Sequence, residues 1–271
     1  MFSLLILDQL LVVCPVYNEE GRIGKVLDGI QKLTDNVIVI NDGSTDKSLL
    51  EIEIHQVKVI SHQFNWGKGC AIRTGMDYFL SSGFDYVLFM DGDGQHKPED
   101  IPAFISQLEK EEADLVIGSR FDDNKWKTTM PFSRKFSNLM SRFGLWLLYN
   151  GFTVKDPQNG FRVYRKRLVK CLSFYPHKYE TEMEILILSY LMNFRVVNIP
   201  IESLYSENQS SKFSLLYDTW TIPNVMLKLF FSYRPWLLRS NNKKLGFRAK
   251  KQEESMLNYA VNNLPKYIIP S

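Results

Sequence analysis

Two aspartates one residue apart have the clearest chemical potential in this chain. Asp91 and Asp93 follow the apolar run Tyr86-Val87-Leu88-Phe89 and precede the polar turn Gly94-Gln95-His96. Alternate side chains of a strand point to the same side, and a turn also lets both carboxylates reach one ion. Carboxylates suit a hard divalent cation shared with a phosphate-bearing ligand. The alternative is a solvated Asp-Gly turn between a strand and a helix, which is common.

Two more polar motifs follow apolar runs earlier in the chain. In the segment 15–20, we expect the backbone and Glu19 to lie beside a nucleotide; the alternative is a plain turn in which Asn18 and Glu19 cap a helix. In the segment 41–46, Asp42 can accept hydrogen bonds from the imino and amino groups of a nucleobase, and Gly43 permits close backbone approach. The alternative for the second motif is a capped turn.

The segment 65–73 is rich in glycine and basic residues and leads into a helix. Such a helix start attracts phosphate, and Lys68 and Arg73 would add positive charge. The spacing of glycine and lysine is not that of a P-loop. As an alternative, both side chains are solvated helix charges.

The elements that must position these motifs alternate between strands and helices. Apolar runs predict strands at 10–14, 37–40, 57–60, 84–90 and 115–117; helical periodicity and caps predict helices at 21–33, from 45, at 68–80 and from 98. This alternation predicts an α/β fold with a mostly parallel sheet covered on both faces. Ligands of such sheets bind beyond the carboxyl ends of the strands, where the segments 15–17, 41–43 and 91–93 fall.

The second half is more helical. We predict a long amphipathic helix at 130–149, a loop at 155–165 that enters a short strand, a helix at 180–192 and a strand at 194–199, followed by an apolar stretch at 215–233. From Arg239 the chain turns polar and basic.

Composition narrows the class of protein. The chain has 271 residues and a net charge of +3, which is too small to argue for a nucleic-acid partner. Three widely separated cysteines form no metal-ligand spacing and suggest a reduced cytosolic setting. The apolar N-terminus is interrupted by Asp8 and preceded by no basic residue, so it resembles neither a signal peptide nor a spanning helix. We therefore expect any membrane contact to be peripheral.

Five motifs together resemble family 2 glycosyltransferases with the GT-A fold, especially the dolichyl-phosphate mannosyltransferase and polyprenyl-phosphate glycosyltransferase branch. They occur in the family's order: Pro-Val-Tyr-Asn-Glu-Glu, Asn-Asp-Gly-Ser-Thr-Asp, Asn-Trp-Gly-Lys-Gly, Met-Asp-Gly-Asp-Gly-Gln-His and Gly-Ser-Arg-Phe. The resemblance covers residues 11–121, is extended by 156–162 and fades after about 213. It implies a single catalytic domain over 1–238, with a Rossmann-like nucleotide-sugar half at about 8–121, an acceptor half at about 122–238, and a basic extension at 239–271.

The resemblance implies a donor site for a nucleotide-diphospho-sugar. Asp91 and Asp93 would hold Mg²⁺ or Mn²⁺, Gln95 would lie beside the metal or diphosphate, and Asp42 would contact the base, either uracil or guanine. The same site would include Pro15, Tyr17, Glu19, Lys68 and Arg73.

It also implies an acceptor side. Arg120 matches a phosphate-contacting arginine, Arg134 falls near a second basic position, and Asp156 would reach the metal or acceptor. Arg162 would support the site and help to bind the acceptor. A late histidine of some members, and a basic residue before Ser-Lys near the end of their catalytic domain, have no match; the second region offers only Lys212.

The nucleophile separates two hypotheses. A lipid phosphate is already anionic and needs cations but no general base, and Arg120, Arg134 and Arg162 would supply them. A saccharide or glycolipid hydroxyl needs a carboxylate base, for which Asp156 is the candidate. Three arginines and one base favour inverting transfer to polyprenyl phosphate. A third hypothesis, of another class, is a nucleotide-sugar-binding module without turnover.

Two apolar stretches bear on the same choice. One is the helix face with Phe132, Phe136, Leu139, Met140, Phe143, Leu147 and Leu148, for which we expect core packing. The other runs from Leu227 to Arg239, where aromatic residues alternate with basic ones; core packing and an interfacial anchor are equally consistent with it. We hypothesise that the protein sits on the cytoplasmic face of a membrane.

Overall fold

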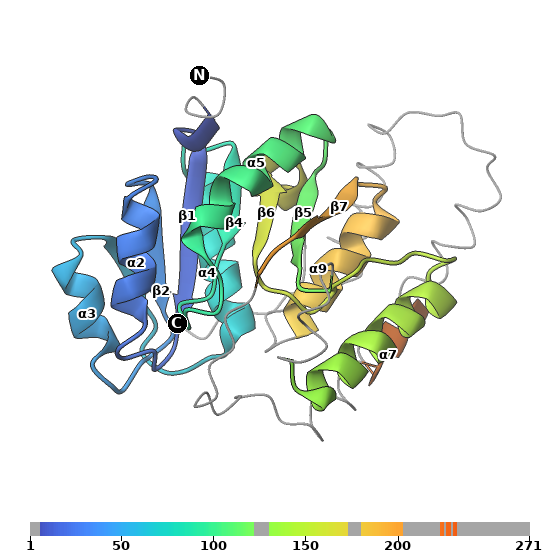
Figure 1. Cartoon of the computed structure of the whole chain (residues 1–271), viewed down its shortest axis with the longest axis horizontal. Coiled ribbons are helices and arrows are strands. Elements are labelled where there is room, and N and C mark those ends of the chain that lie inside the picture. The colour runs from blue at the N-terminus through green and yellow to red at the C-terminus, as the bar shows by residue number, and fades with distance from the viewer. Residues whose placement is uncertain are drawn as a thin grey trace.

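A single sheet of seven strands organises the protein in a computed structural model that describes residues 6–121, 130–172, 180–202, 223–224, 226–228 and 230–231. The strand order is β3-β2-β1-β4-β6-β5-β7, as Figure 1 shows in part. The strands are β1 (Leu10–Val16), β2 (Val37–Asn41), β3 (Lys58–Ser61), β4 (Tyr86–Phe89), β5 (Leu115–Ser119), β6 (Arg162–Arg165) and β7 (Val196–Pro200). They confirm the strands that the sequence predicts and the mostly parallel sheet.

Helices cover both faces of this sheet. The helices α2 (Ile23–Gln31), α3 (Ser48–Ile54) and α5 (Ile101–Lys110) share one core with Leu10, Val12 and Cys14 of β1. The helices α4 (Lys68–Ser81), α8 (Lys166–Val169) and α9 (Glu180–Leu191) share the other core with Leu11 and Val13. Because alternate strand residues meet different helices, both sets must be apolar. This explains the continuous apolar runs of the sequence.

The strand β6 is antiparallel to both of its neighbours, β4 and β5. Its first residue, Arg162, therefore lies opposite Phe89, the last residue of β4. The loop 155–161 that precedes β6 is consequently brought to the edge where the parallel strands end. Hydrophobic patterning could not predict this reversal, because a short buried strand has the same pattern in either direction.

The strand β1 continues through Pro15 to Val16, beyond the predicted strand 10–14. Pro15 pairs in register with Ile40 of β2 and is buried. The amide of Val12 donates to Asn36 O, on the side of β2. Because successive residues of a strand direct their backbone amides to opposite sides, the nitrogen of Pro15 faces β4. The ladder with β4 already ends at Val13. Proline is tolerated there because its missing N–H has no strand to reach.

The helix α7 (Phe132–Leu148) lies beside the end of the sheet at the lower right of Figure 1. Its apolar side chains Phe132, Phe136, Leu139, Met140, Phe143 and Leu147 are exposed, Phe132 by 80%. The expectation of core packing is therefore wrong for these six side chains, whereas the seventh, Leu148, packs against the core. The buried side instead carries Ser137, Asn138, Ser141 and Leu145. Over its first turns the helix thus turns polar side chains inward and apolar side chains outward.

Among the described residues, no helix combines the length and the hydropathy that crossing a membrane requires. The stretch 227–239 and the basic segment 239–271 fall almost wholly outside the described residues, as does Lys212.

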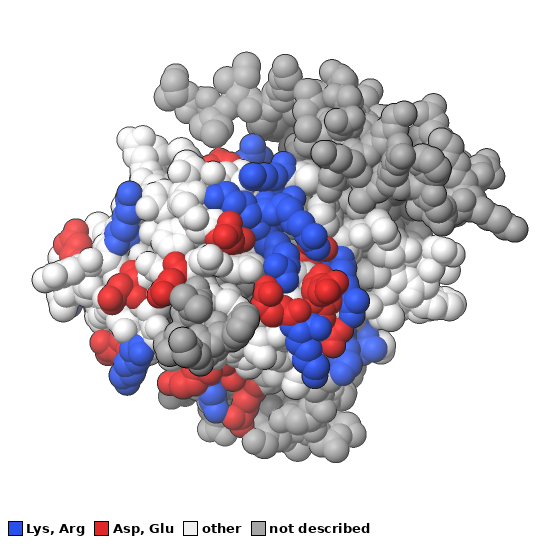
Figure 2. Space-filling model, turned by 90° about the horizontal axis from the view of Figure 1, so that it is seen from above, with Lys and Arg blue, Asp and Glu red and all other residues white. Residues whose placement is uncertain are grey.

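The amino ends of the parallel strands form the opposite face of the molecule, seen in Figure 2. Lys and Arg side chains gather there with acidic side chains among them. Arg165 pairs with Glu109 at 2.8 Å, and Arg167 pairs with Asp114. The positive charges of this face are therefore largely used within the protein.

Candidate active site

The two aspartates lie just beyond the end of β4, next to a lysine that binds one of them. The Lys68 Nζ atom is 2.8 Å from Asp91 Oδ1 and 2.9 Å from Asp91 Oδ2. The same ammonium is 2.9 Å from Oε1 of Glu182, in the first turn of α9. One cation thus joins the start of α4, the loop after β4 and the start of α9.

The charges of this cluster shift the pKa values of its members. Burial opposes the charge of Lys68, but Asp91 and Glu182 outweigh it, so the pKa of the Lys68 ammonium is raised. Burial also opposes the charge of Asp91, yet Lys68 beside it holds the pKa of that carboxyl below its ordinary value. Burial and then repulsion by Asp91 raise the pKa of Asp93.

This geometry fits a divalent cation. Asp91, which already binds the Lys68 ammonium, and Asp93 have the negative charge and the oxygen donors that Mg²⁺ or Mn²⁺ prefers. Glu182 Oε2 is buried without a hydrogen-bond partner in the structure. In the described part of the chain, no three His, Cys, Asp or Glu side chains form a complete metal site. Asp91 and Asp93 would therefore hold a cation together with oxygens from a ligand. The Asx turn of the alternative is present too, since Asp93 Oδ1 accepts the Gln95 amide at 2.9 Å.

A second charged cluster surrounds Asp156, which is fully buried. The Arg120 guanidinium binds it at two points, with Nε 2.6 Å from Oδ2 and Nη2 2.9 Å from Oδ1. Asn138 of α7 donates to Oδ1 at 2.7 Å. Arg134, also on α7, donates to Gln95 Oε1 at 3.3 Å, which links the helix to the Asp91 loop.

Arg162 has a different position from the other two arginines. It is fully buried, and its guanidinium donates to the backbone carbonyls of Asn159, Pro157 and Glu182 at 2.6–2.8 Å. Support of the site fits this structure. Direct contact with an acceptor does not, because all three nitrogen atoms are engaged with main-chain oxygens out of reach of solvent.

Asp42 likewise has partners within the protein. Its carboxylate accepts the amides of Trp66 and Gly67 at 3.0 and 2.8 Å and the His62 ring at 2.7 Å. The side chain is 4% exposed. Its oxygens therefore hold the loop that leads to Lys68, and the expected contact between Asp42 and a nucleobase stays a prediction.

The loops after β1 and β2 are tied together. The amide of Glu19 donates to Ser48 Oγ at 2.7 Å, and the amide of Asn18 donates to Ser44 Oγ at 3.1 Å. The Glu19 carboxylate pairs with Arg22 at 2.6 Å, and Tyr17 is half-buried beside them. Glu19 therefore takes part in the turn that joins β1 to α2, whose N-cap residue, Arg22, makes no side-chain capping hydrogen bond.

Arg73 is in the second turn of α4, and 43% of its side chain is exposed. It pairs with Asp77 one turn later, at 3.5 Å between Nε and Oδ2. This is the arrangement of a solvated helix charge, so the structure favours that alternative for Arg73.

Sequence reasoning missed Glu182, Asn138 and His62. Glu182 carried a partial signal, since three alternating glutamates (Glu180, Glu182 and Glu184) open a helix that is apolar from Ile185 to Leu188, and a buried glutamate requires a partner. Asn138 and His62 carried none, because only the folded chain brings them to Asp156 and Asp42.

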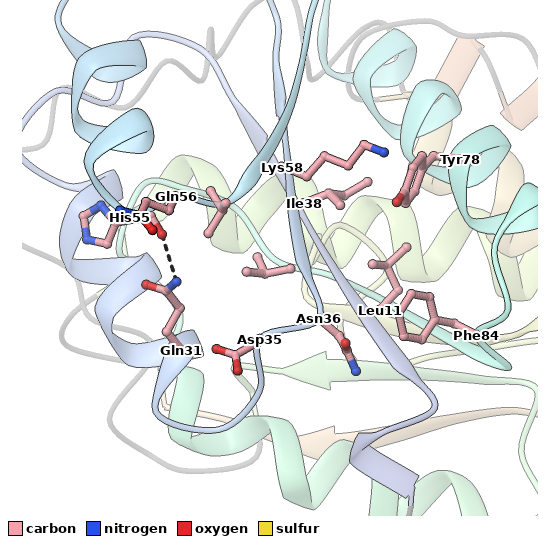
Figure 3. Close-up of a pocket in the computed structure, with 12 residues that line it drawn as sticks. Leu11, Gln31, Asp35, Asn36, Ile38, His55, Gln56, Lys58, Tyr78 and Phe84 are labelled. Carbon is pink, nitrogen blue, oxygen red and sulfur yellow. Dashed lines mark hydrogen bonds between the residues drawn. The ribbon is translucent and has the colours of Figure 1, made fainter.

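The cavity drawn in Figure 3 has a volume of about 460 Å³ and lies away from these clusters. Leu11, Asn36, Ile38 and Lys58 line it from the beginnings of β1, β2 and β3, and Gln31 and Tyr78 from α2 and α4. It is therefore at the other end of the strands from Asp91.

The model of the family described as glycosyl transferase family 2 matches residues 11–173. This range includes Lys68, Asp91, Asp93, Arg120 and Asp156, while Glu182 lies beyond it. The chain belongs to this family. It is a glycosyltransferase with the GT-A fold, as its resemblance implied, and the hypothesis of a binding module without turnover is set aside.

Relatives of this glycosyltransferase cover most of its length. It is 32% identical over 248 residues to the UDP-N-acetylglucosamine–dolichyl-phosphate N-acetylglucosaminyltransferase of Methanococcus voltae, covering 84% of this chain and 95% of the relative. It is 29% identical over 264 residues to the dolichyl-phosphate β-glucosyltransferase of Saccharomyces cerevisiae, covering 86% of this chain and 77% of that one.

A solved structure shares the fold. The glucosyl-3-phosphoglycerate synthase of Mycobacterium tuberculosis, in complex with Mn²⁺, UDP-glucose and phosphoglyceric acid, has a TM-score of 0.64 and 22% identity. The match covers 82% of this chain and 80% of that one.

Proposed function

We propose that this enzyme transfers a sugar, with inversion, from a nucleotide-diphospho-sugar to a polyprenyl phosphate at the cytoplasmic face of a membrane. In the reaction the bond between the anomeric carbon and the diphosphate oxygen breaks, a bond to the acceptor phosphate oxygen forms, and nucleoside diphosphate leaves. A divalent cation at Asp91 and Asp93 would neutralise charge on that leaving group. The relatives named for dolichyl-phosphate acceptors support this acceptor class.

The observation that carries the proposal is the orientation of α7. Its inward side contacts the site through Asn138, which binds Asp156, and through Arg134, which binds Gln95. Its outward side is an exposed stripe with Phe136, Leu139, Phe143 and Leu147. A lipid acceptor needs both features together: a polar site for its phosphate and, one helix diameter away, a surface that enters acyl chains.

The state of Asp156 supports an anionic nucleophile. Its carboxylate oxygens accept two hydrogen bonds from the Arg120 side chain and one from Asn138. A general base for a hydroxyl must turn a free lone pair towards the proton that it takes. Asp156 is instead held by the bidentate Arg120 guanidinium and by Asn138, which occupy lone pairs of both carboxylate oxygens. A phosphate acceptor needs no such base, and Arg134 at the rim of the site is the cation best located to attract it.

The test compares acceptors of matched lipid length. The purified full chain, with Mn²⁺ and a panel of UDP- and GDP-sugars, is given a short polyprenyl phosphate, the corresponding polyprenol, or free sugars, and released nucleoside diphosphate is measured. We expect turnover with the phosphate alone. Turnover with the polyprenol or with a free sugar would refute the proposed acceptor and favour the hydroxyl hypothesis.

A second experiment tests the membrane surface. Flotation with anionic liposomes should recover the wild type with the vesicles at low salt. Replacing Leu139 and Phe143 with serine should leave the protein folded, because both side chains are exposed, and should reduce the recovered fraction. The matched control replaces Leu50 and Ile54, which are exposed apolar residues of α3 on another part of the surface. Equal loss in the two variants, or no binding by the wild type, would contradict the role of α7.

A further inference from the structure

The ammonium of Lys68 occupies a position that is built for a cation. Asp91 provides both carboxylate oxygens and Glu182 a third, all at 2.8–2.9 Å from Nζ. A divalent cation that binds Asp91 without a diphosphate must compete with this ammonium for the Asp91 oxygens. The three anionic oxygens already surround one positive charge. Competition costs free energy whether or not Lys68 is fully displaced.

The surrounding main chain makes room for the ammonium. A Cβ atom at Gly160 would lie 2.7 Å from Lys68 Nζ and 3.1 Å from Asp91 Oδ2. Gly160 belongs to the loop whose neighbours Pro157 and Asn159 are held by the buried Arg162, which also binds the carbonyl of Glu182. The Lys68 amine is therefore bounded on three sides, by Asp91, by Glu182 and by the main chain at Gly160.

Glu182 offers the amine a second partner. One of its oxygens binds Lys68, while the other, Oε2, is buried with no hydrogen bond in the structure. If Lys68 releases Asp91, it can stay paired with Glu182 by moving towards that oxygen. No charge then has to leave the site when a divalent cation arrives.

We propose that Lys68 is a resident counter-cation that keeps Asp91 from binding a divalent cation until a diphosphate arrives with it, and that Glu182 retains Lys68 afterwards. A metal–diphosphate complex brings its own negative charge, which compensates the ammonium, whereas the bare cation does not. The inference rests on the proposed metal-dependent function and adds an order of binding: the metal enters with the nucleotide and is weakly bound before it.

The test measures Mn²⁺ affinity of the nucleotide-free protein by titration calorimetry. We expect Lys68→Met to bind Mn²⁺ about tenfold more tightly than the wild type, or more, because the competing charge is gone. The matched control is Lys97→Met, which removes a nearby positive charge that pairs with Glu202 instead.

The outcomes separate this inference from the proposed function. Equal Mn²⁺ affinity in the wild type, Lys68→Met and Lys97→Met would overturn the role of Lys68 while leaving metal-dependent transfer intact. Equal strengthening in the two lysine variants would also overturn it, since net charge alone would then explain the result. If no variant binds Mn²⁺ and sugar transfer proceeds in a chelator, both the inference and the metal-dependent function fail. Thermal unfolding in a chelator confirms that each variant is folded.

Discussion

His96 gives the structure a pH dependence that can be measured. Its side chain is 6% exposed and packs at a tilt against Phe161, with ring centroids 5.0 Å apart. Burial, with positive charge from Arg120 and Lys68, lowers the pKa of His96 from 6.5 to about 4, although Asp91 acts in the opposite direction. Nδ1 of this ring is buried without a hydrogen-bond partner in the structure. The folded protein therefore holds His96 neutral.

The sign and the size of the effect follow from these two values. Between about pH 6.5 and about pH 4 the unfolded chain binds a proton at this histidine and the folded protein does not, so the free energy of unfolding falls as the pH falls. At about 1.4 kcal/mol per pH unit, the loss attributable to His96 is about 3 kcal/mol. Its burial means that solvent does not screen this cost.

The assay is urea unfolding of the wild type and of His96→Phe in a chelator, at several pH values in this window. Phenylalanine preserves the ring contact with Phe161 and cannot be protonated, so the variant should lose about 3 kcal/mol less than the wild type. Acid effects common to both proteins cancel in the difference. His96→Gln is the second variant, and replacement of His55, which pairs with Asp28 at 3.1 Å, controls for the loss of any histidine. Parallel pH curves for wild type and both His96 variants would refute the reasoning.

Three further predictions concern the rest of the site. Arg162→Met should lower the free energy of unfolding by about 3 kcal/mol or more, because three buried carbonyls lose their donor; the exposed Arg195→Met is the control, and similar midpoints in urea would contradict the prediction. Asp42→Ala should cost about 1–3 kcal/mol and weaken donor binding, since the amides of Trp66 and Gly67 lose their acceptor; unchanged melting temperature and unchanged calorimetric affinity together would count against it. Asp91→Ala or Asp93→Ala should abolish turnover with the circular dichroism spectrum preserved, and near-normal activity in either variant would remove the metal role from this account.

Much of the fold could be predicted from local patterns. The strands predicted at 10–14, 37–40 and 115–117 are continuous apolar runs, because each is buried on both faces by helices. The alternation of strands and helices along the chain predicted the mostly parallel sheet. This sheet brings the Asp91 loop and the loops after β1 and β2 to one edge. The antiparallel β6 was not predictable, since its direction depends on which neighbours it meets.

The outward face of α7 shows where patterning fails. An apolar stripe on a helix predicts a buried face when the only other environment for that stripe is water. The sequence does not show which side of the helix the rest of the protein covers. Here Asp156 and Gln158 need partners, and Asn138, Ser137 and Ser141 supply them. The demand of buried polar groups for hydrogen bonds turned the polar side inward.

The amino-acid sequence by itself determined the elements, the edge of the sheet that carries the site, and the residue types gathered there, because strand periodicity and chain alternation are local properties. Only the tertiary structure decided how the charges are paired. Lys68 binds Asp91 and Glu182, Arg120 pairs with Asp156, and Arg162 is buried beneath the loop that it supports. The Lys68–Asp91 and Arg120–Asp156 pairs join residues that are 23 and 36 positions apart in the chain. Electrostatic energy depends on distance in space rather than on spacing in sequence.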